Sequence, residues 1–193
     1  MQKDEGFESK SISKCGLLFF VVLIGIISFA ASWQIMTKVS GWLNIAKMLT
    51  ALFCLNGAAC VDYREHRIPN IFPLILALGG IIFLVVGYLM GQEGAIAYVV
   101  SSAFGAAGCT LALTIAAFLT KNGIGAGDIK LLGALALMGG VYTISGTLFF
   151  SVLLCTFVSV MLLVARKKDF HGSVPFGPFV LAGYILTLFI IKF

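Results

Sequence analysis

Two aspartates stand out because each lies at the edge of a long apolar run. Asp62 directly follows the run of about 43–61, and Asp128 directly precedes the run that begins at residue 129. Ionisable groups at membrane depth are costly and are candidates for function by default. Two carboxyls held close together share a proton, so one can act as a general base and the other as a general acid. Such a pair suits hydrolysis of a peptide bond by activated water.

Each aspartate also has a simpler interpretation. Asp128 could only favour a helix N-terminus, and Asp62 could pair with Arg64 or Arg67. The sequence does not say which carboxyl would be the acid and which the base, because only the pair would have meaningful pKa values.

Glycines precede the second aspartate at alternate positions. They are Gly123, Gly125 and Gly127. Glycine lets another backbone come close, as an extended peptide substrate would require. The loop is not a phosphate loop, because the G-K-[ST] ending is absent. Lys130, two residues after Asp128, could interact with its charge or only anchor the helix end.

Prolines mark the same side of two further runs. Pro69, followed by Asn70, is predicted to open a helix in its first turn. Pro175 and Gly177 predict irregular backbone, which membrane depth tolerates only when it is buried in protein or lines a water-filled cavity. We therefore expect an active-site wall there, with an ordinary proline-initiated helix as the alternative. Arg67 could orient a substrate or serve only as a topology signal.

The composition indicates the elements that must position these residues. The chain of 193 residues is 60% hydrophobic and 11% charged, whereas soluble domains are about half apolar and about a quarter charged. A spanning helix needs about 20 mostly apolar residues. Apolar runs cover residues 15–33, 43–61, 71–90, 95–119, 129–138 (extending as far as 142), 145–165 and 175–191. The prediction is an all-α, polytopic transmembrane bundle of about seven helices, in which Gly139-Gly140 breaks or bends the fifth.

The chain is expected to divide into a polar segment (1–14), an additional N-terminal transmembrane helix with its connection (15–41), and a six-helix membrane-embedded core (42–193). The first run could instead be a signal peptide cleaved near Ala30-Ala31-Ser32.

Basic residues predict the orientation, since they accumulate on the cytoplasmic side. With the N-terminus in the cytoplasm, three of the 13 Lys and Arg residues face outward: Lys38, Lys47 and Lys192. The other ten face the cytoplasm: Lys3, Lys10, Lys14, Arg64, Arg67, Lys121, Lys130, Arg166, Lys167 and Lys168. Both aspartates then lie at cytoplasmic helix ends.

The formal charge of +5 does not indicate nucleic-acid binding, because the basic residues stand in short groups between apolar runs. The five cysteines form no C-x-x-C pair and no Cys/His cluster, so we expect no disulfide framework, no metal site and no cofactor.

Three motifs follow one another in the chain: Asp62-x-x-x-x-Arg67-Ile68-Pro69-Asn70, Gly125-Ala126-Gly127-Asp128-Ile129-Lys130-Leu131-Leu132 and Pro175-Phe176-Gly177-Pro178. Together they resemble the type IV prepilin peptidases, G-x-G-D membrane aspartyl proteases, over residues 43–191. The resemblance implies a catalytic dyad of Asp62 and Asp128 in a multi-pass protein of the cell membrane, surrounded by lipid. It implies substrates that are prepilins or pilin-like precursors with a basic leader and a hydrophobic stem, cut at the cytoplasmic face.

Longer members of this family carry paired C-x-x-C motifs, and many methylate the new N-terminus. The connection between the first two runs is short here, and those pairs are absent. The chain therefore resembles the short, peptidase-only members, and N-methyltransferase activity is not expected. The sequence does not indicate an oligomeric state.

Three other interpretations remain open. A proton-coupled transporter would use paired acids, but it should place them within the runs and often shows internal repeats. A presenilin-like protease pairs G-x-G-D with Tyr-Asp, whereas Tyr63 follows Asp62 here. A catalytically inactive homologue would not need both aspartates.

Overall fold

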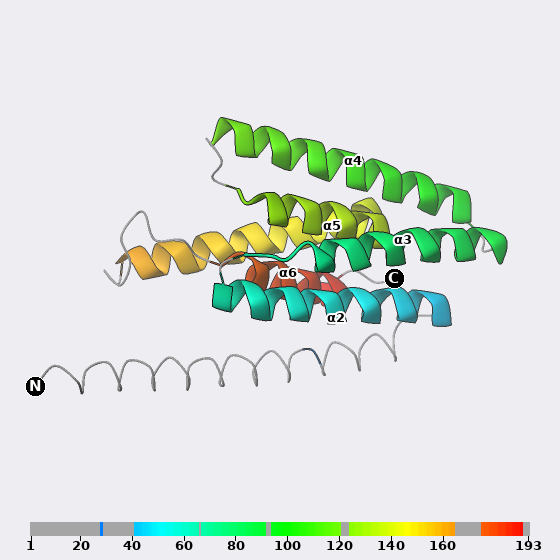
Figure 1. Cartoon of the computed structure of the whole chain (residues 1–193), viewed down its shortest axis with the longest axis horizontal. Coiled ribbons are helices and arrows are strands. Elements are labelled where there is room, and N and C mark those ends of the chain that lie inside the picture. Colours follow the sequence, from blue (N-terminus) through cyan, green and yellow to red (C-terminus); the bar gives the residue numbers. More distant parts are fainter. Residues whose placement is uncertain are drawn as a thin grey trace, which may run out of the picture.

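The computed structural model describes residues 28, 41–65, 67–91, 94–120, 124–164 and 175–190. Helices are the only regular secondary structure among these residues (Figure 1). Apart from the helical residue Ser28, they form five helices: α2 (Trp42–Glu65), α3 (Ile71–Leu89), α4 (Ala95–Leu119), α5 (Ala126–Val164) and α6 (Gly177–Ile190). The all-α prediction is confirmed, and the apolar runs of the described core match these helices to within a few residues.

Helix α5 contains a sharp reversal. Gly140 has φ 74° and ψ −179°, which is not helical, and the chain doubles back at this point (Figure 1). The left-handed φ explains the glycine, because it avoids the clash that a Cβ would make. The hydroxyl oxygen of Ser101 in α4 accepts a hydrogen bond from the N–H of Val141 at 3.1 Å, which caps the second half. The predicted break at Gly139-Gly140 is therefore confirmed as a helical hairpin.

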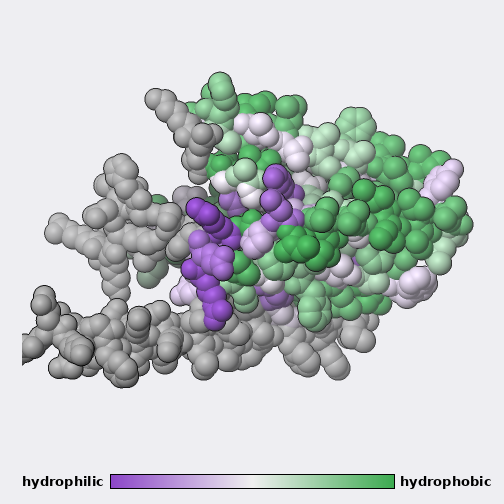
Figure 2. Space-filling model, in the orientation of Figure 1, coloured by the Kyte–Doolittle hydropathy of each residue, from purple (hydrophilic) through white to green (hydrophobic). Residues whose placement is uncertain are grey.

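Four segments of the described chain are long and apolar enough to cross a membrane: α2, α3, α4 and Ala126–Met161 of α5. Large apolar side chains point outward along them, such as Phe53, Phe104 and Phe118. Hydrophobic residues cover most of the visible face, and the strongest hydrophilic colour gathers at one end (Figure 2). The number of seven helices and the cytoplasmic N-terminus stay predictions.

Most of the first predicted run lies outside the described residues. Ser28 is described and is helical. Its hydroxyl donates a hydrogen bond to the side-chain oxygen of Asn56 in α2 at 2.8 Å. This bond places Ser28 beside α2. The division of the chain at residues 14 and 41 stays a prediction.

Helix α5 occupies the centre of the bundle and packs against α3, α4 and α6. Its buried residues include Leu131, Leu132 and Leu135, which are fully enclosed. Close helix packing in membranes relies on small residues. At Gly183 of α6, an added Cβ would stand 2.7 Å from the carbonyl oxygen of Thr147 in α5. The glycine therefore sets how closely α6 approaches α5.

The helix ends that carry the candidate residues lie together. The end of α2 and the starts of α3, α5 and α6 are at the same end of the bundle (Figure 1). In the same orientation, this is the end where hydrophilic residues gather (Figure 2). We call it the aspartate end, and the opposite end the distal end.

We predict that Gly183→Ala destabilises the chain, because α6 must move away from backbone atoms of α5. Overpacking of this kind should lower the midpoint of thermal unfolding in detergent by about 5 °C or more. Gly108→Ala is the matched control, since nothing lies within 4 Å of the added Cβ. Equal midpoints for the two variants would contradict this account of the α5–α6 contact.

Candidate active site

Asp62 lies in the last turn of α2 and is 6% exposed. Its Oδ2 accepts a hydrogen bond from the backbone N–H of Gly177 at 2.7 Å, although 115 residues separate the two. Gly177 is the first residue of α6. The first N–H groups of a helix have no partner within the helix, and this end of the helix dipole favours negative charge. The start of α6 therefore supplies both a donor and a favourable field for the Asp62 carboxylate.

The contact between Asp62 and Gly177 requires a residue without a side chain. A Cβ on Gly177 would stand 3.0 Å from both the Cβ and the Oδ2 of Asp62. It would also stand 3.3 Å from the Cα of Ala59, one turn earlier in α2. An alanine at 177 would therefore push the carboxylate or the helix away.

Asp128 lies in the first turn of α5 and is partly buried. Its N–H donates to the carbonyl oxygen of Gly125 at 3.1 Å, and the backbone of Gly125 donates to its carboxylate. A Cβ on Gly125 would stand 2.9 Å from the Oδ2 of Asp128. Gly125 thus leaves room for the carboxylate to fold back over the start of its own helix. Gly123 lies outside the described residues.

The two carboxyls are near enough to interact electrostatically. One comes from the end of α2 and the other from the start of α5, at the same end of the bundle (Figure 1). Like charges at short range repel, so each carboxyl lies in the electric field of the other. The fold therefore places two carboxyls, from different helices, at one end of the bundle.

The connection between α2 and α3 contacts the start of α5. A Cβ on Gly127 would stand 3.1 Å from the Cβ and 3.3 Å from the carbonyl oxygen of Ile68. The Nζ of Lys130 donates to the Oδ1 of Asn70 at 3.2 Å. Gly127, Lys130 and Asn70, three of the predicted supporting residues, thus take part in contacts between the start of α5 and the connection from α2 to α3.

The start of α3 differs slightly from the prediction. Pro69 is not in the first helical turn, because the helix begins at Ile71 and Asn70 is its N-cap residue. The carbonyl oxygen of Pro69 accepts the N–H of Phe72 at 3.3 Å, which begins the turn before the helix. Asn70 makes no side-chain cap bond, since its side chain bonds to Lys130 instead.

The remaining predicted residues have weaker contacts. Arg67 is exposed, and Pro175 is partly buried just before α6. The sequence did not identify Ile68 as a site residue. It lies within the first motif, but its side chain has no reactive group, and only its packing against Gly127 shows its place at the site. Within the described ranges, no group of three His, Cys, Asp or Glu side chains could hold a metal ion.

Residues 48–160 match the type IV leader peptidase family. Curated relatives include the "Prepilin leader peptidase/N-methyltransferase" of Aeromonas hydrophila, 28% identical over 159 residues, which cover 79% of this chain and 52% of the relative. The protein of the same name from Pseudomonas aeruginosa is 29% identical over 147 residues, covering 73% and 48%. That of Bacillus subtilis is 34% identical over 83 residues, covering 43% and 34%.

The chain thus spans about half the length of the first and second of these relatives. No solved structure matches it significantly. The family match includes the positions of Asp62 and Asp128 and extends over more than half of the 193 residues. On that extent of similarity, the chain belongs to the type IV leader peptidase family of membrane proteases.

Proposed function

We propose that this protein is an aspartic endopeptidase that removes the leader from type IV prepilins or pilin-like precursors. The observation that carries the proposal is the pair of carboxyls, Asp62 and Asp128, which interact at one end of an apolar helix bundle. The names of the relatives, which specify prepilin leader peptidase activity, support the substrate class.

In the proposed reaction, the ionised carboxyl of the pair takes a proton from a water molecule. The water oxygen attacks the carbonyl carbon of the scissile bond, and the protonated carboxyl gives its proton to the carbonyl oxygen. As the intermediate collapses, the ionised carboxyl takes a proton from one of its hydroxyls and the C–N bond breaks, while the other carboxyl gives its proton to the leaving amine. The pair thus again holds one proton. The proton belongs to the pair as a whole, so neither Asp62 nor Asp128 is assigned a single role.

The substrate fits the bundle if its hydrophobic stem lies among lipid along the apolar helices and its basic leader stays at the aspartate end. Gly125 is exposed beside Asp128 and presents no side chain to an incoming extended peptide. The ten-to-three distribution of Lys and Arg residues supports the cytoplasmic face as the side of cleavage.

We predict that Asp62→Asn and Asp128→Asn each abolish cleavage of a prepilin in membranes, with rates at least about 100-fold lower because one proton-transfer group is lost. Glu65→Gln is the matched control, since Glu65 is an exposed acid one turn after Asp62, and it should cleave at the wild-type rate. Mass spectrometry of the product measures both the rate and the cut site. A folded Asn variant with near-full activity would refute the two-aspartate mechanism.

The same product reports on methylation. Because none of the five cysteines forms a C-x-x-C pair, we propose that this chain cleaves without methylating. With S-adenosylmethionine present, the mature product should keep the mass of an unmodified N-terminus. A product heavier by one methyl group, formed by the purified chain alone, would show that the proposal of peptidase activity alone is wrong.

Gly177→Ala should reduce cleavage more than it reduces stability. The added Cβ displaces the Asp62 carboxylate from the N–H of residue 177, and a misplacement of about 1 Å can cost about 100-fold in rate. Gly183→Ala, on the same helix but away from Asp62, separates loss of positioning from loss of packing. The expected pattern is a larger loss of kcat for Gly177→Ala and a larger fall in unfolding midpoint for Gly183→Ala. The reverse pattern would show that Gly177 does not position the Asp62 carboxylate.

A further inference from the structure

A buried lysine lies at the distal end of the bundle. Lys47, in the second turn of α2, is 6% exposed. The acidic residues of the described chain are Asp62, Glu65 and Asp128, and all three belong to the aspartate end. Along α2, Lys47 and Asp62 are 15 positions apart, which corresponds to about 22 Å. The Lys47 ammonium therefore has no described carboxylate near it.

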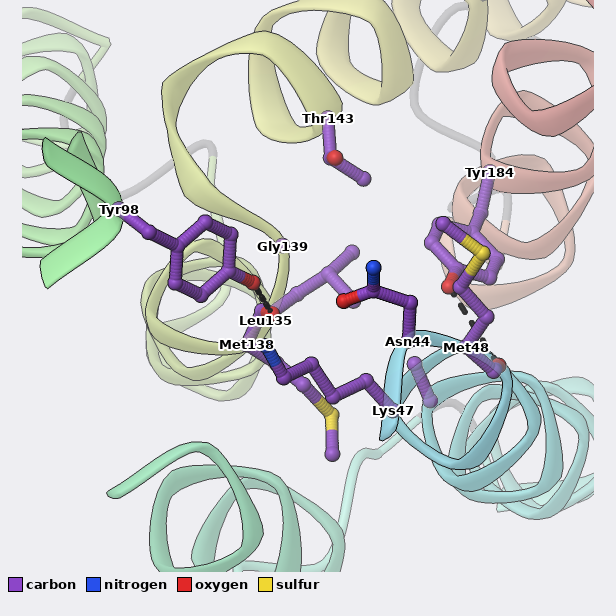
Figure 3. A pocket seen from close by; sticks show the side chains of 10 residues that line it. Asn44, Lys47, Met48, Tyr98, Leu135, Met138, Gly139, Thr143 and Tyr184 are labelled. Atoms are coloured by element: carbon purple, nitrogen blue, oxygen red, sulfur yellow. Dashed lines mark hydrogen bonds between the residues drawn. The ribbon is translucent and has the colours of Figure 1, made fainter. Parts of the chain in front are cut away.

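Its immediate neighbours compensate the charge only in part. The Nζ of Lys47 lies 4.1 Å from the centroid of the Tyr98 ring, a cation–π contact that attracts the ammonium without accepting its hydrogens. The hydroxyl of Tyr98 donates to the carbonyl oxygen of Met138. Tyr184 donates to the carbonyl oxygen of Met48 at 3.4 Å. Both phenols are thus directed to backbone atoms (Figure 3).

Two cavities meet at this lysine. One, of about 260 Å³, lies among α2, α4, α5 and α6, and the other, of about 140 Å³, lies among α2, α3 and α4. Asn44, Lys47 and Tyr98 line both. A single water needs only about 10–15 Å³ of such volume, so either cavity has room for a larger polar group. Figure 3 shows the Lys47 side chain extending from α2 across the larger cavity toward α5.

We propose that this lysine cavity, lined by Lys47, Asn44 and Tyr98, binds a phosphate oxyanion, supplied by the headgroup of an anionic phospholipid. A buried ammonium is stabilised by a counter-charge and by hydrogen-bond acceptors, and lysine binds phosphate as a compact point charge. Basic pockets between transmembrane helices accept anionic headgroups. The smaller cavity adjoins the α3–α4 end, where Tyr88 is exposed, so a lipid can approach from the side.

The site is separate from the aspartates, so it neither requires nor supports the proposed peptidase chemistry. The test measures lipid retention by the 193-residue chain in detergent, using native mass spectrometry. The probes are phosphatidylglycerol and phosphatidylcholine with identical acyl chains. Wild type should retain phosphatidylglycerol about tenfold more strongly, which is the effect of one charge-assisted contact.

Two variants distinguish the effect of the buried lysine on lipid preference from the effect of surface charge. Lys47→Met removes the charge at similar volume and should abolish the preference for phosphatidylglycerol. Arg64→Met removes an exposed charge from the other end of the same helix and should keep it. If Lys47→Met retains the preference, the proposal is overturned. Should that variant not fold, Lys47→Arg and Lys47→Gln replace it, with retention expected for arginine and loss for glutamine.

Inorganic phosphate distinguishes the source of the anion. The unfolding midpoint is measured in phosphatidylcholine alone, with and without millimolar phosphate. If phosphate raises the midpoint of wild type but not of Lys47→Met, the lysine cavity binds an oxyanion, and its occupant is soluble phosphate. If neither phosphate nor phosphatidylglycerol acts through Lys47, the proposal fails.

The last variant tests Glu93, which lies outside the described residues, as a source of the counter-charge within the chain. A lipid preference that appears only in Glu93→Gln would mean that the chain neutralises Lys47 itself, which also overturns the proposal.

Discussion

The burial of the Asp62 carboxylate constrains the rest of the structure. A carboxylate enclosed by protein is costly unless donors replace the lost water, and the donor here is the N–H of Gly177 at 2.7 Å. That bond requires α6 to begin directly beside the last turn of α2. It also requires α6 to pack closely on α5. Gly183 permits this because it has no Cβ, which would stand 2.7 Å from the Thr147 carbonyl oxygen. The position of the first carboxyl is thus determined by packing along the whole of α6.

The second carboxyl reaches the same place by a different route. Asp128 is held at the start of α5, where Gly125 receives and bonds its carboxylate. The hairpin at Gly140 lets one continuous segment pass through the bundle and return. The first half brings Asp128 to the aspartate end, and the second half supplies the surface on which α6 packs. Lys130 and Asn70 then join the two aspartate-bearing segments.

Local pattern was enough to predict the helices but not their contacts. The run predicted at 95–119 coincides with α4, and the break at Gly139-Gly140 followed from glycine alone, because both depend on neighbouring residues. The motifs located Asp62, Asp128 and Gly177, but the bond across 115 residues depends on tertiary packing that no local pattern carries. Lys47 was interpreted as a topology signal. Its burial, at 6% exposure, arises from the arrangement of α2, α4 and α5 around it.

The central claim is that the two carboxyls act as one unit, and a double-mutant comparison tests it most directly. Prepilin cleavage rates are measured for wild type, Asp62→Asn, Asp128→Asn and the variant that carries both changes. Groups that share one task are strongly non-additive, so the double variant should be no slower than the slower single variant. If the two losses instead multiply, the aspartates act independently, and the account of a shared proton is wrong.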